Sequence, residues 1–252
     1  MEPKDRIIVA LDVDATDKAL DLVLKLSPHV GYFKIGLEFI TSMLVQLLTA
    51  GSEMEANFKL NKLRALFSTL DGNVFWDGKF DDIPNTIAGA SRALTKLQVK
   101  MFNVHASSGI DAMMAAVAHK EQALVLAVTV LTSREENDGN MTFGGPTKAK
   151  VLQFAREAKL AGCDGIVCSP QELALLGKRN ELRGLLRVTP GIRSKDDTPD
   201  DQKRTMTASE AIKAGADYLV IGRPITAAKD PVESAKTFAG QIAYALSQKQ
   251  VA

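Results

Sequence analysis

Short apolar runs rich in valine and isoleucine recur along the chain and alternate with longer segments of helical spacing. The apolar runs are RIIVALD from Arg6, YFKIG from Tyr32, VFWDGK from Val74, MFNVHA from Met101, LVLAVTVLTS from Leu124, GIVCS from Gly165, LRVTPG from Leu186 and YLVIGRP from Tyr218. Segments such as TDKALDLVLKL and PVESAKTFAGQIAYALSQ lie between or after them. The short runs predict buried strands, and the longer segments predict amphipathic helices.

Eight predicted strands that alternate with helices favour an α/β fold in which a parallel sheet closes into a (β/α)8 TIM barrel. The alternation continues to the C-terminus, so residues 1–252 are expected to form a single barrel domain. An open doubly wound sheet is the main alternative. It is disfavoured because no Gly-x-Gly-x-x-Gly follows the first predicted strand.

Three segments are longer than a minimal barrel needs. Between Ile35 and Val74 the helical pattern suffices for two helices, or for one helix and an elaborated connection. Residues 133–148 and 193–207 are polar segments after the fifth and seventh predicted strands. We expect both to be loops at the positions where barrels cover their ligands.

Composition and charge narrow the possible partners. The 252 residues are 46% hydrophobic and carry a formal net charge of +1, from 31 basic and 30 acidic side chains. No global field attracts nucleic acid or an anionic membrane, so any anion must be bound locally. The N-terminal MEPKDRIIVALD lacks the apolar core of a secretory signal, and the apolar run ALVLAVTVL is too short to span a bilayer. A soluble cytoplasmic protein is therefore expected, with Cys163 and Cys168 as core thiols because their spacing matches no common zinc or redox pair.

The end of the third predicted strand carries the most unusual cluster of charges. In FWDGKFDDIPNT, Asp77 and Lys79 share one face of the strand, and Asp82 follows in the loop. Burying the pair against the helices would be costly, so we assign it to the barrel mouth, together with Lys34 from the second strand. The cluster could be a structural salt-bridge network or could hold an ammonium ready to donate a proton. The carboxylates could instead bind magnesium, although the interleaved lysines disfavour it.

The ends of the seventh and eighth predicted strands supply a candidate anion site. VTPGIR places Gly191 after the seventh strand, and VIGRPIT places Gly222 and Arg223 after the eighth. Many barrels bind phosphate at these two strand ends, through glycine N–H groups and the start of a short helix. The guanidinium fork of Arg223 fits phosphate oxygens. A turn role is the simpler interpretation of Gly222 alone, but the three residues together favour phosphate binding.

The spacing of Asp77, Lys79 and Asp82, followed directly by Ile-Pro-Asn-Thr, resembles the signature of the orotidine 5′-phosphate decarboxylase family. The Asp-x-Lys-x-x-Asp core occurs in a wider superfamily of sugar-phosphate enzymes, whereas the Ile-Pro-Asn-Thr run is more specific. The resemblance covers nearly the whole chain, through IVALDV, FKIGLE, FNVHAS, AVTVLTS, DGIVCS, VTPGIR, DQKR and VIGRP.

The resemblance implies a homodimeric barrel that converts orotidine 5′-monophosphate to uridine 5′-monophosphate and carbon dioxide, the last step of pyrimidine nucleotide synthesis, with no metal and no organic cofactor. It implies that Lys79 protonates C6 of the pyrimidine within a charged array that includes Lys34, Asp77 and Asp82. The implied substrate contacts are Asp12 and Lys34 for the ribose, Thr132 and Ser133 for the pyrimidine edge, Arg193, Gln202, Gly222 and Arg223 for the phosphate, and Asp82, Ile83 and Thr86 reaching into the partner subunit's site.

Two residues depart from the family pattern, since Gly78 and Asp81 stand where a larger residue and a histidine or asparagine are expected. Neither is a matched catalytic position. Two other functions stay open at this stage. One is a magnesium-dependent sugar-phosphate decarboxylase or aldolase-type synthase of the same superfamily, and the other is a barrel that binds a nucleotide as a sensor without catalysis.

Overall fold

The computed structural model describes residues 1–134, 136–193 and 204–250, and within these ranges eight parallel strands form a closed barrel. Each strand pairs with its neighbours in the sequence, and the first pairs with the last. The strands are β1 (Ile7–Ala10), β2 (Tyr32–Gly36), β3 (Val74–Phe80), β4 (Met101–His105), β5 (Leu124–Val128), β6 (Gly165–Val167), β7 (Leu186–Thr189) and β8 (Tyr218–Ile221). The predicted (β/α)8 barrel is confirmed, and the open sheet is excluded.

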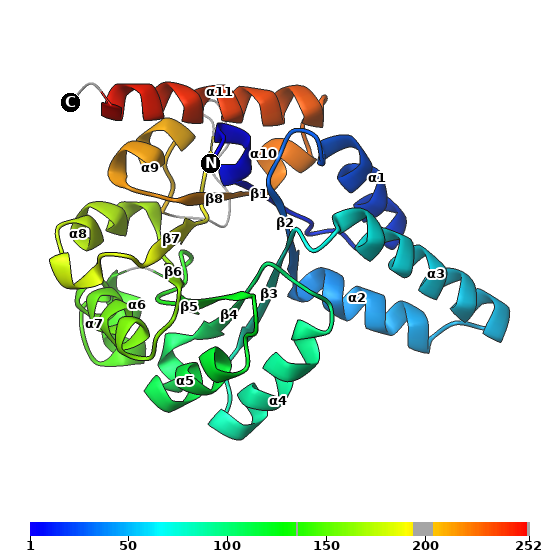
Figure 1. The fold of residues 1–252 in the computed structure, drawn as a ribbon, viewed down its shortest axis with the longest axis horizontal. Coiled ribbons are helices and arrows are strands. Elements are labelled where there is room, and N and C mark those ends of the chain that lie inside the picture. Colours follow the sequence, from blue (N-terminus) through cyan, green and yellow to red (C-terminus); the bar gives the residue numbers. More distant parts are fainter. Residues whose placement is uncertain (135, 194–203, 251–252) are drawn as a thin grey trace.

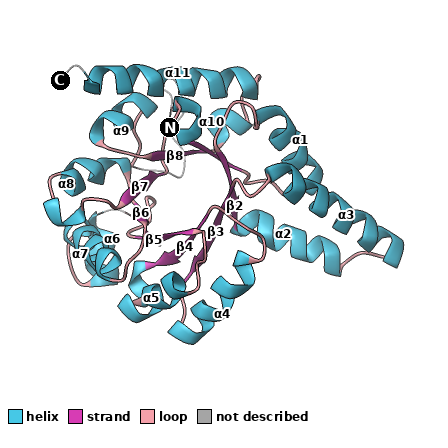
Figure 2. Cartoon of the chain, in the orientation of Figure 1, coloured by secondary structure: helices cyan, strands magenta, loops and turns pink. Residues whose placement is uncertain are grey.

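Helices surround the strand ring (Figures 1 and 2). They are α1 (Thr16–Leu26), α2 (Leu37–Leu48), α3 (Glu53–Leu70), α4 (Pro84–Thr95), α5 (Ile110–Ala118), α6 (Glu136–Phe143), α7 (Thr147–Leu160), α8 (Leu173–Gly177), α9 (Ala208–Ala214), α10 (Arg223–Thr226) and α11 (Pro231–Gln250). The local sequence determines where several of these helices begin. Pro84 opens α4 at its first position, and Thr207 caps α9 by accepting a hydrogen bond from the Glu210 N–H. No helix in the described ranges is long and apolar enough to cross a membrane.

Alternation along the strands divides the core into two layers. On β1, Ile7 and Val9 pack toward the helices, while Ile8 and Ala10 fill the barrel interior. The interior layer is completed by Phe75, Met101, Leu126, Val188, Tyr218 and Val220. These side chains fill the barrel below its mouth. Inward-facing polar residues further along the same strands must therefore face the mouth.

The long second unit forms two helices, which was one of the two possibilities expected. α2 and α3 project from one side of the barrel in Figure 1. The segment after β5 differs from the expected loop, because α6 and the start of α7 occupy much of it. The sequence SREENDGNMTFGGPTK has weak helical periodicity, so it does not predict a helix by itself. In the structure, Phe143 at the end of α6 packs edge-to-face on Phe154 of α7 and holds α6 against that helix.

Strand β3 is irregular where its charged residues begin. Trp76 pairs with Phe102 of β4, but the next pairing is Phe80 with Val104, so four residue steps on β3 oppose two on β4. The excess is two residues. Because side chains alternate with a period of two, an even excess leaves each residue on its original face. Trp76 and Phe80 therefore both pack on the outer core, as predicted for Trp76, and Asp77 and Lys79 both face the mouth.

Candidate active site

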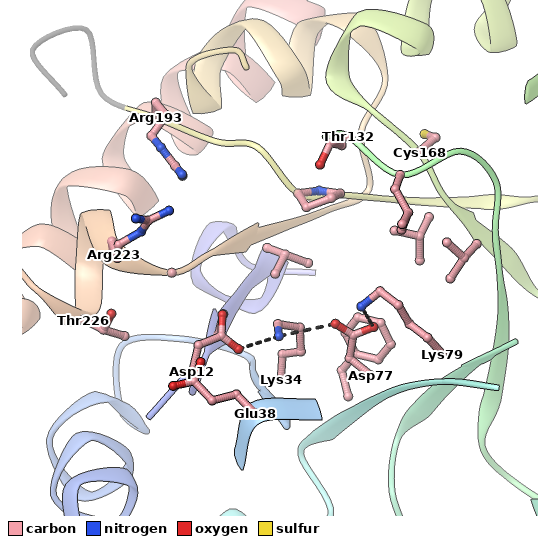
Figure 3. Close-up of a pocket in the computed structure, with 18 of the residues that line it drawn as sticks. Asp12, Lys34, Glu38, Asp77, Lys79, Thr132, Cys168, Arg193, Arg223 and Thr226 are labelled. Atoms are coloured by element: carbon pink, nitrogen blue, oxygen red, sulfur yellow. Dashed lines mark hydrogen bonds and ion pairs between the residues drawn. The ribbon is translucent and has the colours of Figure 1, made fainter. Parts of the chain in front are cut away.

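A cavity of about 630 Å³ opens at the carboxyl ends of the strands. Predicted site residues that line it are Asp12, Lys34, Asp77, Lys79, Thr132, Arg193, Gly222 and Arg223. They come from both ends of the sequence, because barrel closure brings β8 next to β1. Figure 3 shows the carboxylates and lysines along one side of this cavity and the two arginines on another.

The charged side of the cavity is a continuous chain of ion pairs. Lys34 Nζ lies 2.8 Å from Asp12 Oδ1 and 3.3 Å from Asp77 Oδ2. Lys79 Nζ lies 2.8 Å from Asp77 Oδ1. The Asp77 carboxylate therefore sits between two ammonium groups, and its side chain is only 10% exposed. Lys79 is the more accessible of the two lysines, with 30% of its side chain exposed against 11% for Lys34.

Burial and pairing act in opposite directions on these groups. Burial alone would lower the pKa of Lys34, but the charges of Asp77 and Asp12 outweigh it and raise that pKa above 10.5. Burial alone would raise the pKa of Asp77, but Lys34, Lys79 and hydrogen bonds outweigh it and lower that pKa below 3.8. Lys34 and Asp77 thus stay ionised at neutral pH because each supports the charge of the other.

Asn103 of β4 also belongs to this cluster, although the sequence analysis did not predict it as a site residue. Its Nδ2 donates to Asp77 Oδ1 at 2.5 Å, and its Oδ1 accepts the Lys79 backbone N–H at 2.8 Å. A signal was present, because Asn103 is a polar residue in an apolar run and shares its inward face with Met101. Glu38, Cys168, Pro190 and Thr226 also line the cavity. Burial raises the pKa of the Cys168 thiol, so it stays protonated and is a poor nucleophile.

The opposite side of the cavity is cationic. Figure 3 shows the guanidinium groups of Arg193 and Arg223 pointing into the cavity. The loop that carries Arg193 begins at Gly191, whose φ of +80° lies in the left-handed region that favours glycine. Met206 pairs with this segment, because its N–H donates to the Gly191 carbonyl and its carbonyl accepts from the Arg193 N–H. These two bonds hold the Arg193 backbone at the rim, and Arg223 lies at the start of α10.

Arg204 ties this side to the loop after β5. Its guanidinium pairs with Glu172, which is 2% exposed, and donates at 2.8 Å to the Leu131 carbonyl. Leu131 and Thr132 both line the cavity, so the tie fixes the backbone next to Thr132. Ser133 is exposed and lies outside the cavity lining. Gln202 falls outside the described residues.

Asp82, Ile83 and Thr86 do not join the cavity of their own chain. All three are exposed where β3 passes into α4, and Ile83 is 66% exposed. Asp82 Oδ1 accepts the Ile83 backbone N–H at 2.7 Å. In the described part of the chain, no group of three or more His, Cys, Asp or Glu side chains is placed to hold a metal ion.

A closed eight-stranded barrel with a charged cavity at the carboxyl ends of its strands is the architecture of (β/α)8-barrel enzymes. Residues 5–238 match the family model described as orotidine 5′-phosphate decarboxylase / HUMPS. The chain belongs to this family.

Individual relatives agree with the family match. The orotidine 5′-phosphate decarboxylase of Moorella thermoacetica is 44% identical over 253 residues, covering 96% of this chain and 94% of the relative. That of Halorhodospira halophila is 42% identical over 245 residues, covering 95% and 97%. A crystal structure of orotidine 5′-phosphate decarboxylase from Lactobacillus acidophilus superimposes with a TM-score of 0.74 at 30% identity, over 94% of this chain and 98% of that one.

The coupling between Lys34 and Asp77 predicts an altered alkaline stability for Asp77→Asn. A raised pKa means that the folded protein holds the Lys34 proton more tightly than the unfolded chain does. The resulting stabilisation is fully present below 10.5 and is lost as the pH rises through the folded-state pKa. Asp77→Asn removes one supporting carboxylate, so it should lower the folded-state pKa of Lys34 and reduce the stabilisation that the bound proton provides.

Urea unfolding from about pH 8 to pH 11 should give Asp77→Asn a lower free energy of unfolding than the parent at pH 8, and this deficit should narrow as the pH rises and the Lys34 proton is lost. Asp21→Asn is the matched control, because it removes a carboxylate that pairs with exposed Lys25 on α1. Parallel pH profiles for all three proteins would contradict the coupling.

Proposed function

We propose that this protein decarboxylates orotidine 5′-monophosphate to uridine 5′-monophosphate and carbon dioxide, with Lys79 as the proton donor to C6. Membership in the family supports the overall reaction. The observation that carries the assignment of Lys79 is its ammonium group, which lines the cavity and is held 2.8 Å from the buried Asp77 carboxylate.

The chemistry requires a fixed positive charge near C6. When the bond from C6 to the carboxylate carbon breaks, its electron pair stays on C6 in the ring plane, where the π system cannot delocalise it. An ammonium at about 4 Å in an effective dielectric near 20 attracts such a charge by about 4 kcal/mol. The Lys79 ammonium then gives its proton to C6 and becomes a neutral amine, which regains a proton from water after release of the products.

An attraction of this size is smaller than the transition-state stabilisation that enzymes provide, so contacts remote from C6 must contribute. Arg193 and Arg223 line the side of the cavity away from Lys79, where they can hold the 5′-phosphate with charge-assisted hydrogen bonds. Binding energy from a phosphate that does not react can stabilise the transition state if it orders the surrounding loops. Asp12 and Lys34 lie between the arginines and Lys79 in Figure 3, where the ribose would reach. Thr132 lines the cavity and can contact the pyrimidine edge. The proposed substrate contacts of Ser133 and Gln202 are inferred from the family resemblance alone.

A homodimer with shared sites is the second part of the proposal. Asp82, Ile83 and Thr86 are exposed and outside the cavity of their own chain, so they are free to complete the cavity of a second copy. Large apolar side chains are also exposed on the two helices that precede β3. They are Leu37, Leu44, Val45 and Leu48 on α2 and Met54 and Phe58 on α3. A second copy that covers this surface would remove apolar area from water.

Lys79→Ala should lower kcat by at least about 10³-fold, because it removes both the proton donor and the charge that stabilises the carbanion. The measurement is the loss of orotidine 5′-monophosphate absorbance in EDTA. Lys25→Ala, which removes an exposed lysine of α1, should keep parental activity. A folded and fully active Lys79→Ala protein would refute the role of Lys79. A parent that binds the nucleotide without turnover would support a sensor, and activity on sugar phosphates that needs magnesium would support the other superfamily chemistry.

Arg223→Ala should raise KM for the same substrate by about 10- to 100-fold, because it removes a charge-assisted contact to phosphate. Steady-state kinetics measure this change, and thermal unfolding reports whether the fold is kept. Arg183→Ala removes an exposed arginine that precedes the amino end of β7 and does not line the cavity, so it serves as the control. Unchanged KM in Arg223→Ala would remove it from the phosphate site.

Mixing Lys79→Ala with Asp82→Ala should restore activity if each site is shared. After unfolding and refolding together, half of the dimers are hybrids, and each hybrid has one intact site, so an equal mixture should recover about a quarter of parental activity. Lys79→Ala mixed with Asp77→Ala is the control, because both changes affect the same chain's contribution and no hybrid contains an intact site. Absence of recovery in hybrids verified by native mass spectrometry would contradict the shared site.

A further inference from the structure

The Lys79 backbone has an unusual conformation for a residue with a side chain. Its φ is +48°, in the left-handed region that disfavours residues with a Cβ. It lies inside the irregular part of β3, where the pairing with β4 skips from Trp76 to Phe80. The Lys79 N–H therefore has no partner in the regular strand ladder, and buried N–H groups need an acceptor.

Asn103 supplies that acceptor from the opposite strand. Its side chain lies across from the irregular stretch, is 1% exposed, and accepts the Lys79 N–H at 2.8 Å. The carboxamide thus replaces a main-chain carbonyl of β4 at the point where the ladder is interrupted. This bond joins residues 24 positions apart and holds Lys79 in its left-handed conformation.

The other end of the same carboxamide holds the partner of the Lys79 ammonium. Asn103 Nδ2 donates to Asp77 Oδ1, the oxygen that also accepts from Lys79 Nζ. The two bonds define the orientation of the amide, since only Nδ2 can donate to a carboxylate and only Oδ1 can accept an N–H. One planar group thereby fixes both the backbone of Lys79 and the carboxylate that aims its side chain.

We propose that Asn103 is a positioning residue for the proton transfer by Lys79, holding the lysine backbone and the Asp77 carboxylate in one fixed arrangement. The inference rests on the proposed decarboxylase function. It assigns to Asn103 no contact with substrate. Catalysis falls steeply when a reacting group is displaced by a fraction of an ångström, so loss of this arrangement should reduce kcat far more than it changes KM.

Asn103→Ala removes both hydrogen bonds, and Asn103→Asp changes only one of them. In Asn103→Asp the acceptor for the Lys79 N–H remains, but the donor to Asp77 is replaced by a second carboxyl group. Two carboxyl groups at this separation titrate as a pair and share one proton over a range of pH. With that proton present, the new group donates to Asp77 and accepts from Lys79, as asparagine does. Acidification should therefore restore the function of Asn103→Asp.

The other charged groups around the carboxamide are common to all variants. They are Asp77 and Lys79 on β3, Lys34 on β2, Asp12 after β1, and His105, which follows Asn103 on the inward face of β4. Burial lowers the pKa of His105. On the β5 side, the inward neighbours Leu126 and Val128 are apolar. Dividing each variant's kcat by the parental kcat at the same pH removes the titration of these shared groups.

The experiment measures kcat and KM for orotidine 5′-monophosphate across the pH range in which the parent is stable. We expect Asn103→Ala to lower kcat by about 10- to 100-fold at every pH, with KM within about threefold of the parent. We expect the relative kcat of Asn103→Asp to rise with falling pH, by up to about tenfold per pH unit for a one-proton step. Thr129→Val is the control for a lost buried hydrogen bond, since Thr129 is 1% exposed and donates to the Val167 carbonyl at 2.9 Å. It should keep a relative kcat near one at every pH.

Each outcome bears on a defined part of the inference. Parental kcat in folded Asn103→Ala would overturn it, and so would equal and pH-independent losses in Asn103→Ala and Asn103→Asp, which would indicate a packing role only. If Asn103→Ala does not fold, the pH dependence of kcat in Asn103→Asp tests the inference alone: a relative kcat that rises with falling pH supports it, and a pH-independent one overturns it. A parent without turnover would instead overturn the decarboxylase proposal.

Discussion

The placement of the Asp77 carboxylate between two ammonium groups is the interaction on which the rest of the site depends. A buried carboxylate or ammonium group is unfavourable alone, and each of the three charges is tolerated because its neighbours are opposite in sign. Lys34 comes from β2 and Asp77 and Lys79 from β3, so the chain of charges also requires adjacent parallel strands in one register. The apolar interior layer directly below prevents water from screening it from that side. Fold and electrostatics are therefore inseparable at this end of the barrel.

Much of this could be predicted from the sequence, because it follows from local periodicity. Eight apolar runs gave the strand count, and the alternation of Asp77 and Lys79 with Trp76 and Gly78 placed the charges at the mouth. The sequence did not predict the irregularity in β3. The assignment of the charges to the mouth is correct nevertheless, because an even number of extra residues leaves each side chain on its original face.

Features that depend on distant partners could not be predicted in this way. The left-handed backbone at Lys79 is supported by Asn103, which is 24 residues away, and no local propensity encodes such a bond. Similarly, Arg204 pairs with Glu172 and the Leu131 carbonyl across three separate loops, although in the sequence it is only one of several charges in a polar segment. Helix α6 was missed because its own sequence has little helical pattern and its order depends on packing against α7.

The burial of both cysteines has a practical consequence for experiments in solution. Cys163 and Cys168 are the two cysteines of the chain, and both are at most 6% exposed, with thiol pKa values raised by burial. Thiol-directed reagents react through the accessible thiolate, so neither native cysteine competes well for them at neutral pH. A cysteine introduced at an exposed loop position would thus accept a single fluorophore with the native pair left in place. The barrel offers a background in which the movements of its mouth can be followed by one optical label at a time.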